Sequence, residues 1–222
     1  MLANIYLHYA FDLWVHHWRK TRAKGDVIVV RYADDFIVGF QHRHEAERLL
    51  ADLRERFKRF GLALHPDKTR ILEFGRFARE NLSHRGEGKP ETFNFLGFTH
   101  ICGKTRGGGF TVIRRTMRTR RQAKLKEVYQ ELKRRMHDPI PEQGAYLRAV
   151  VGGHIRYYGV PMNGASLSAF RKEIGRLWSL VLKRRSQKHR MTWDRLKRLI
   201  DRWLPAVRVC HPYPLVRVGV IT

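Results

Sequence analysis

The ten residues RYADDFIVGF (31–40) carry two adjacent carboxylates, Asp34 and Asp35, between apolar runs at residues 27–30 and 36–38. Short apolar runs on both sides of a tight polar turn are typical of a β-hairpin, and we expect both strands to be well buried. Because a turn lets neighbouring side chains converge, the hairpin would hold both carboxylates at its tip. Carboxylate oxygens suit hard divalent cations, and two such cations can clamp the attacking and leaving oxygens of a phosphoryl transfer.

An Asp-Asp pair by itself is most often a solvated turn, since turns favour Asp. The flanking residues favour a different interpretation. The run Tyr32-Ala33-Asp34-Asp35 resembles the YxDD box of reverse transcriptases, in the YADD form typical of group II intron reverse transcriptase/maturases. The resemblance implies that Asp34 and Asp35 are catalytic Mg²⁺ ligands, and that Tyr32 and Ala33 contact the incoming nucleotide.

The net charge of the chain indicates the kind of partner, independently of any motif. The chain has 222 residues, 43% of them hydrophobic, and a formal net charge of +25. The hydrophobic fraction supports a real core, and the charge predicts a polyanionic partner, with nucleic acid as the first candidate. A membrane partner is not expected, because no long uncharged apolar stretch exists. Cys102 and Cys210 have no metal-ligand spacing, so we expect free thiols and a cytoplasmic protein.

The first helix and the segment after it also resemble the family. Residues 2–24 have helical apolar spacing, and LANIYL (2–7) resembles the segment that precedes the YADD hairpin, which implies that Ala3 and Asn4 lie near the nucleotide. A core-packing helix explains the apolar positions equally well. Residues 44–60 predict a second helix, ended by Gly61.

Two further motifs follow in the family order. GLALHPDKT (61–69) resembles the family's GLxL…xKT segment, in which Lys68 would approach the leaving pyrophosphate; a solvated surface lysine is the open alternative. Residues 75–91 predict a loop. The resemblance of Phe95-Leu96-Gly97-Phe98 to the FLGF primer grip implies contact with the primer, and Gly97 would let a nucleic-acid backbone approach closely. A buried strand with a bulge is the alternative, and residues 107–109 predict a hairpin tip.

From residue 114 the pattern becomes helical and strongly basic. Residues 114–222 hold 26 Lys and Arg against 7 Asp and Glu, a net charge of +19. Apolar stripes run through residues 125–136, 167–181 and 193–203, the last between a Thr192 cap and Pro205. The block at residues 152–159 resembles the maturase-specific (thumb, or X) domain, in which one tyrosine could stack on bases and the other pack in the core. The predicted RNA-binding residues are Arg118, Arg120, Arg121, Lys124, Arg156, Tyr157, Lys183, Arg184 and Arg185.

The expected fold class is α+β. Residues 1–113 would form the C-terminal part of a reverse transcriptase palm, an antiparallel sheet with helices, and residues 114–222 an all-helical thumb/maturase domain. The resemblance implies an RNA-directed DNA polymerase, a nucleotidyltransferase that adds deoxynucleotides to a DNA primer on an RNA template. It also implies maturase action on the RNA of a group II intron, a mobile element whose splicing the protein would assist.

Polymerases of this family use three carboxylates, and the third precedes the LANIYL segment. Because that segment begins at Leu2 here, we expect an incomplete two-metal Mg²⁺ site, no finger region, and no activity of the chain alone. An N-terminal reverse transcriptase half or self-association would then cover exposed apolar surface. The alternatives are a non-catalytic RNA-binding splicing factor and a basic structural protein of a ribonucleoprotein, although paired carboxylates at a hairpin tip argue against the second.

Overall fold

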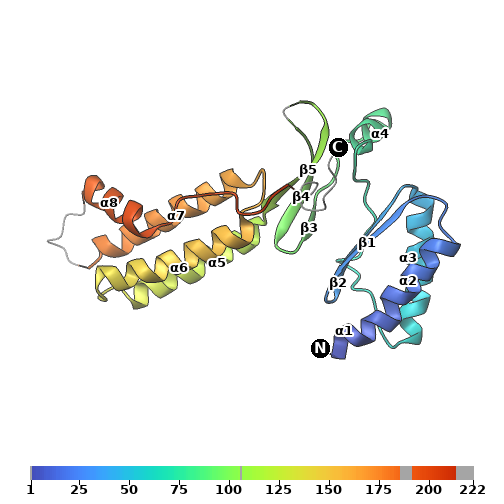
Figure 1. Ribbon diagram of the computed structural model, residues 1–222, viewed down its shortest axis with the longest axis horizontal. Helices are drawn as coiled ribbons and strands as arrows, with labels where there is room; N and C mark the ends of the chain where they lie inside the picture. Colours follow the sequence, from blue (N-terminus) through green and yellow to red (C-terminus); the bar gives the residue numbers. More distant parts are fainter. Residues whose placement is uncertain (1, 106, 186–191, 214–222) are drawn as a thin grey trace. The chain divides into compact units, whose positions relative to one another are not determined.

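The computed structural model describes residues 2–105, 107–185 and 192–213 of the chain. They belong to two compact units, Met1–Glu73 and Phe74–Thr222 (Figure 1). The three-stranded sheet that contains the FLGF run therefore lies in the same unit as the basic helices. The division of the sequence at residues 113 and 114 follows the family resemblance and stays a prediction.

The first unit is a β-hairpin with helices on one face. The predicted helix over residues 2–24 is present as a continuous helical segment that ends at Thr21, with a π-helical turn in the middle. The second predicted helix is confirmed, and Gly61 follows it with a φ of 63°, as a C′ glycine should. The elements are α1 (Leu2–Leu7), η1 (His8–Asp12), α2 (Leu13–Thr21), β1 (Val27–Tyr32), β2 (Asp35–Phe40) and α3 (Arg43–Arg59).

The predicted hairpin is confirmed. Strands β1 and β2 pair antiparallel, and the last pair of residues is Tyr32 opposite Asp35. The loop therefore has two residues, Ala33 and Asp34, and Ala33 has a φ of 55°. A positive φ at the first central position alone is the pattern of a type II′ turn, whose twist matches that of the flanking strands.

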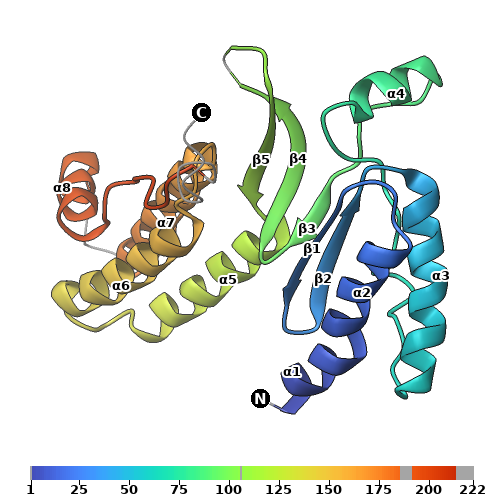
Figure 2. The same ribbon diagram turned by 45° about the vertical axis from the view of Figure 1, so that its right-hand side comes forward.

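The expectation that both strands are well buried is wrong. Strand β1 alternates strictly between half-buried and exposed residues. Val29 and Val38 pack on a core formed by α2 and α3, whereas Ile28, Val30 and Tyr32 are 67%, 48% and 66% exposed. The cause is visible in Figure 2, where both helices cover the same face of the hairpin.

A buried carboxylate fixes the loop that leads into β1. Glu45, near the start of α3, is only 2% exposed, and its Oε1 accepts hydrogen bonds from the amides of Lys24 (2.6 Å) and Gly25 (3.2 Å). These two bonds lower the pKa of Glu45 and keep the carboxylate charged. The loop therefore enters the hairpin at a defined position.

The second unit joins a three-stranded antiparallel sheet to a helical bundle. The sheet order is β3-β4-β5. Cys102 and Cys210 are free thiols, as expected. The elements are α4 (Ala78–His84), β3 (Phe93–Phe95), β4 (Phe98–Lys104), β5 (Phe110–Thr116), α5 (Arg118–Arg134), α6 (Ile140–Tyr158), α7 (Gly164–Lys183) and α8 (Trp193–Trp203).

Three expectations for this unit need correction. Residues 75–91 contain a short helix, α4, which is held by only two buried side chains, Ala78 and Leu82. The chain after residue 114 does not begin as a helix, because β5 pairs with β4 as far as Thr116. Trp193 is 71% exposed and does not belong to the buried stripe of α8, although the Thr192 cap is confirmed.

The bundle core consists of the predicted apolar stripes of α5 and α7 together with α6. Val128, Phe170, Ile174 and Trp178 are completely buried there. One polar side chain, Gln143, is also completely buried, and its Oε1 accepts a hydrogen bond of 2.8 Å from the Trp178 indole nitrogen. This bond satisfies the polar atom of a buried tryptophan.

A second buried amide connects the sheet to the bundle. Asn163 precedes α7, and its Oδ1 accepts a hydrogen bond from the amide of Thr116 (3.0 Å), while its Nδ2 donates to Thr116 Oγ1 (2.9 Å) and to the Tyr158 carbonyl (2.8 Å). The end of β5 is therefore fixed to the connection between α6 and α7. In the described ranges, no helix has the length and apolar character needed to cross a membrane.

Candidate functional site

The two carboxylates of the YADD run lie side by side at the hairpin tip. Asp34 is the second residue of the turn, and Asp35 is the first residue of β2; both are exposed. Within the described part of the chain, neither side chain has a hydrogen-bond or ion-pair partner. Two neighbouring uncompensated carboxylates repel each other, and a cation placed between them would relieve that repulsion.

The open face of the hairpin leads to this tip. Residues directly opposite each other in an antiparallel pair point to the same face, so Asp35 shares a face with Tyr32 and with the exposed residues Ile28 and Val30. The tip therefore presents charge at the end of an uncovered apolar surface. The exposed ring of Tyr32 and the turn residue Ala33, both predicted nucleotide contacts, lie beside the carboxylates.

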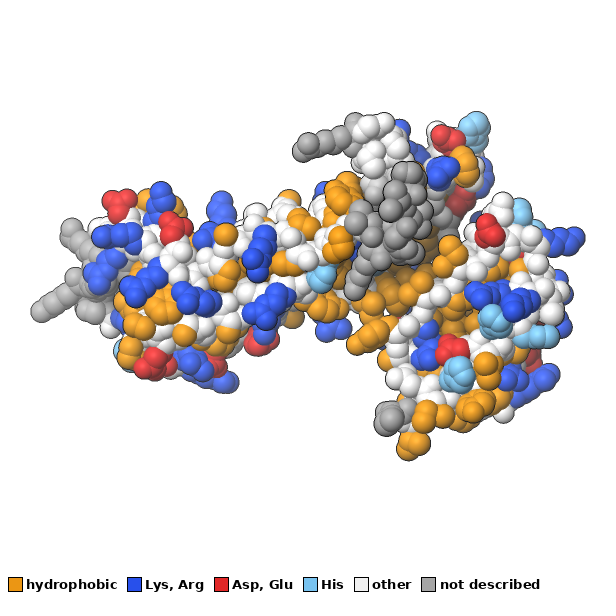
Figure 3. Space-filling model, in the orientation of Figure 1, with side chains coloured by type: hydrophobic (Ala, Val, Ile, Leu, Met, Phe, Trp, Pro, Cys, Tyr) orange, Lys and Arg blue, Asp and Glu red, His pale blue; other side chains and the backbone are white. Residues whose placement is uncertain are grey.

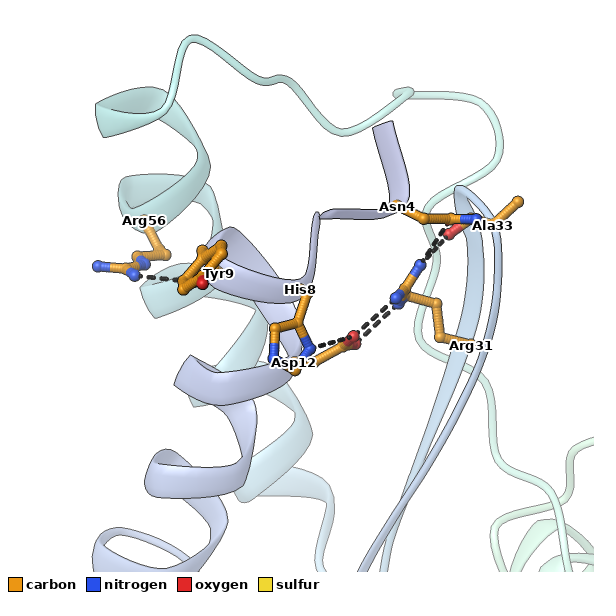
Figure 4. A network of polar contacts seen from close by, with 7 residues as sticks. All are labelled: Asn4, His8, Tyr9, Asp12, Arg31, Ala33 and Arg56. Carbon is orange, nitrogen blue, oxygen red and sulfur yellow. Dashed lines mark hydrogen bonds and ion pairs between the residues drawn. The ribbon is translucent and has the colours of Figure 1, made fainter. Parts of the chain in front are cut away.

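An arginine connects the tip to the N-terminal helices (Figure 4). Arg31 Nε and Nη2 donate to the two oxygens of Asp12 at 2.7 and 2.6 Å, and Nη1 donates to the Ala33 carbonyl at 2.6 Å and to Asn4 Oδ1 at 3.2 Å. The hydrogen bonds from Arg31 lower the pKa of Asp12, and His8, whose Nδ1 lies 3.4 Å from Asp12 Oδ2, acts in the same direction. The predicted residue Asn4 thus contacts the network, and Ala3 is exposed on α1.

Asp12, Arg31 and His8 belong to this network but were not predicted as parts of the site from the sequence. A signal for Arg31 exists, because it occupies the same face of β1 as Val27 and Val29, which face the helices. A charged side chain at such a position needs a partner. The sequence does not identify that partner, because Asp12 lies 19 residues away.

Lys68 is placed in an exposed turn, where its amide donates to the His65 carbonyl at 3.3 Å. Among the contacts of the described residues, its ammonium group has none with Asp34 or Asp35. Its predicted role toward the leaving pyrophosphate stays a prediction.

The FLGF run forms a second tight turn in the other unit. Phe95 pairs with Phe98, and the two loop residues, Leu96 and Gly97, have φ values of 48° and 75°. Two positive φ values are the pattern of a type I′ turn, so the run is a hairpin turn and not a bulge. A Cβ at Gly97 would lie 2.8 Å from the hydroxyl of Tyr158. The glycine therefore makes room for this tyrosine.

Tyrosines of α6 hold the FLGF turn. Tyr157 donates a hydrogen bond of 3.1 Å to the Leu96 carbonyl, and its ring is stacked on Phe98 with 6.0 Å between centroids. Tyr158 packs edge-on against the same Phe98 ring and is half-buried, whereas Tyr157 is 55% exposed. Of the two tyrosines, Tyr157 is the one with a ring available to a base.

Three cations of α5, which we call the α5 basic face, lie close to α6: Arg120, Arg121 and Lys124. Their positive charge acts on two residues of α6. Lys124 and Arg121 help to lower the pKa of the buried His154, and Arg120 opposes the burial that raises the pKa of the half-buried Tyr158. Burial is the main cause for His154, whose pKa falls from 6.5 to about 4. Lys124 is also bonded to Glu127 at 2.7 Å.

The other predicted RNA-binding cations have different environments. Lys183, Arg118 and Arg156 are exposed, and Arg184 Nη1 donates to the Tyr129 hydroxyl at 3.3 Å. Arg185 binds the carbonyls of Met136 and Asp138, so its guanidinium group stabilises the connection between α5 and α6. Figure 3 shows Lys and Arg side chains spread over the visible face of the helical region.

The two predicted metal ligands, Asp34 and Asp35, both lie at the hairpin tip. No group of three or more His, Cys, Asp or Glu side chains is close enough to hold a metal ion in the described ranges. Mg²⁺ commonly uses one or two carboxylates together with substrate phosphates and water. The exposed, unpaired Asp34 and Asp35 fit such a site.

Comparison with known proteins agrees with the geometry of the first unit. Residues 1–100 match the model of the family described as "Reverse transcriptase (RNA-dependent DNA polymerase)". No curated protein matches the chain significantly. The family match covers the YADD hairpin and the FLGF turn, and it supports a nucleic acid polymerase domain over these residues.

Proposed function

We propose that the chain supplies the YADD part of a group II intron reverse transcriptase/maturase. The observation that carries the proposal is the pair of unpartnered carboxylates, Asp34 and Asp35, at a hairpin tip inside a match to the reverse transcriptase family. In a chain with a net charge of +25, these two adjacent carboxylates are exposed and have no cationic partner among the described residues, and a metal ion would complement their charge.

The reaction is the attack of a primer 3′-hydroxyl on the α-phosphate of a deoxynucleotide, with pyrophosphate as the leaving group. Asp34 and Asp35 would hold Mg²⁺, which neutralises charge on the phosphates as they react. Ala33, at the turn, and the exposed ring of Tyr32 would contact the nucleotide. Lys68 would reach the pyrophosphate as a charge partner.

The second unit would bind the nucleic acid. The FLGF turn would grip the primer, and the exposed Tyr157 ring would stack on an unpaired base. The α5 basic face lies close to His154 and Tyr158 of α6 and would contact phosphates, as would Lys183 and Arg184. The net charge of +19 over residues 114–222 supports this role and the companion role in intron splicing.

Two observations favour the second candidate function, an RNA-binding splicing factor without polymerase activity. The charge is concentrated in residues 114–222, and the described residues form no group of three or more His, Cys, Asp or Glu side chains that could hold a metal ion. Polymerases of this family use three carboxylates, so we propose that synthesis requires a further polypeptide segment that supplies the third.

The test is primer extension on an RNA template with Mg²⁺, in which the full chain is assayed alone and with an added N-terminal polypeptide of a related reverse transcriptase. Extension by the mixture, together with RNA binding, supports a polymerase completed by another segment. RNA binding without extension in either arm supports the splicing factor. Strong extension by the chain alone would contradict the need for a third carboxylate from elsewhere.

A further inference from the structure

The network in Figure 4 leads from α3 to the hairpin tip through charged side chains that the proposed reaction does not use. We propose that Asp12 and Arg31 form a positioning pair, which fixes the backbone of the Ala33–Asp34 turn and thereby sets the direction of the two carboxylates. This inference rests on the proposed function of Asp34 and Asp35.

The two side chains form a bidentate ion pair. Arg31 Nε and Nη2 donate to both oxygens of Asp12, at 2.7 and 2.6 Å. Because a guanidinium group is planar, two bonds to one carboxylate determine the direction of its remaining N–H groups. Nη1 is thereby aimed at the Ala33 carbonyl, which it contacts at 2.6 Å. The side chains of Arg31 and Asp12 are only 16% and 30% exposed, so water competes weakly for these bonds.

The turn is a place where such support is needed. Ala33 has a φ of 55°, a conformation that is unfavourable for a residue with a Cβ and that persists where the surroundings hold it. The Ala33 carbonyl belongs to the same peptide group as the Asp34 amide. A hydrogen bond from Arg31 to this carbonyl therefore fixes the peptide plane from which the Asp34 side chain departs.

The helical turn that carries Asp12 is held by a second arginine. It is the last residue of the π-helical turn η1, and such turns occur often at functional sites. Arg56, from α3, donates to the carbonyls of Tyr9 (3.2 Å) and Ala10 (3.3 Å) in the same turn, while its guanidinium group lies 4.3 Å from the centre of the Phe60 ring. The turn that carries Asp12 is thus anchored on α3.

The pairing also excludes a simpler role for Arg31. A guanidinium group beside a nucleotide site is an obvious phosphate ligand, but four of its five donor bonds are directed at Asp12, Ala33 and Asn4. Its charge is neutralised by Asp12. Arg31 therefore acts through the turn, as a positioning residue, and not on the substrate.

The experiment uses nuclear magnetic resonance on the full chain with two readouts. The Ala33 ¹³C chemical shifts report the turn conformation without metal, and line broadening by Mn²⁺ reports metal capture at Asp34 and Asp35. The variants are Asp12→Asn, which keeps the size and one acceptor, and Arg31→Lys, which keeps the charge but loses the bidentate pairing. Asp26→Asn removes an exposed carboxylate elsewhere and is the matched control.

We expect both variants to shift the Ala33 signals and to lower the affinity for Mn²⁺, measured by titration of the broadening, about tenfold, equivalent to ~1.4 kcal/mol. The double variant should bind Mn²⁺ no more weakly than either single variant, because each single substitution already breaks the Asp12–Arg31 pair. The signal of Leu53, a buried residue of α3, should not move. An unchanged Leu53 signal would show that the first unit remains folded.

Asp12→Asn with unchanged Ala33 signals and unchanged broadening would overturn the positioning pair. So would additive effects of the two substitutions, because they would show independent roles. If the unaltered protein shows no Mn²⁺ broadening at Asp34 and Asp35, the proposed function fails instead, and the Ala33 signals alone then decide the positioning role.

Discussion

Tyr157 donates a hydrogen bond from its hydroxyl to the Leu96 carbonyl at 3.1 Å, and this bond joins α6 to the FLGF turn. The residue as a whole remains 55% exposed. The hydroxyl and the ring therefore have separable roles, the first in holding the turn and the second in contacting nucleic acid.

Tyr157→Phe and Tyr157→Ala should separate these roles. Tyr157→Phe loses one partly exposed hydrogen bond, so we expect a loss of about 0.5–1 kcal/mol in unfolding free energy and little change in affinity for single-stranded RNA. Tyr157→Ala should weaken RNA binding by about 1–3 kcal/mol, the usual contribution of a stacked base. Urea denaturation and fluorescence anisotropy measure the two quantities. An equal loss of RNA affinity in both variants would show that the ring does not stack on RNA.

His154 should make stability depend on pH. Its pKa is about 4 in the folded protein against 6.5 in the unfolded chain, so the unfolded chain binds more protons between these values. Stability should therefore be unaffected by this group above pH 6.5, fall as the pH drops toward 4, and change no further below that, with a total loss on the order of 3 kcal/mol.

The check is urea denaturation at several pH values for the unaltered chain and for His154→Phe. Phenylalanine keeps the ring that stacks on Phe170, at a centroid distance of 3.7 Å, but it cannot be protonated. His100, whose pKa is also lowered by burial, contributes equally to both proteins, so the difference between them isolates His154. The exposed His137→Gln serves as control. A pH dependence that survives in His154→Phe would contradict the assignment.

The α5 basic face should determine much of the salt dependence of RNA binding. Replacement of Arg120, Arg121 and Lys124 by Ala removes three cations, and each lost phosphate contact should reduce the slope of log affinity against log salt by about 0.7–0.9. A matched triple variant of exposed cations on α3, at Arg48, Arg54 and Lys58, removes the same charge. Equal reductions in the two triple variants would mean that only net charge matters.

The open face of the hairpin should promote association. Ile28 and Val30 are 67% and 48% exposed on a sheet face that their own helices leave uncovered. Ile28→Thr with Val30→Thr keeps the β-branched shape and makes the face polar, so we expect a weaker concentration dependence of the sedimentation coefficient. Val112→Thr, at an exposed position of β5, is the control. Sedimentation that is independent of concentration in the unaltered chain would contradict this prediction.

Local patterns predicted the elements of the first unit well. The apolar runs around Asp34 and Asp35 gave the hairpin, and the periodicity of residues 44–60 gave α3. The open face was not predicted, because two apolar strands look alike whether one or both faces are covered. Only the position of the helices decides which strand residues are buried.

The missed features depend on contacts between distant residues. The Asp12–Arg31 pair joins residues 19 positions apart. The short α4 buries only Ala78 and Leu82, and the polar residues around them hide the helical pattern in the sequence. Trp193 continues an apolar stripe in the sequence, but the bundle does not extend to it. The periodicity of a sequence shows which face of a helix or strand is apolar, but the packing of its neighbours decides how much of that face is buried.

The central claim is that the carboxylates at the hairpin tip carry a metal-dependent polymerase reaction. The most direct measurement is Mg²⁺-dependent primer extension by the chain completed with an N-terminal reverse transcriptase polypeptide, with Asp34→Asn and the control Asp26→Asn assayed in parallel. Asp34→Asn removes a charged metal ligand and barely alters the basic helices, so we predict that extension is lost while RNA affinity stays within about twofold. Near-normal extension by Asp34→Asn, or an equal loss in Asp26→Asn, would contradict the account.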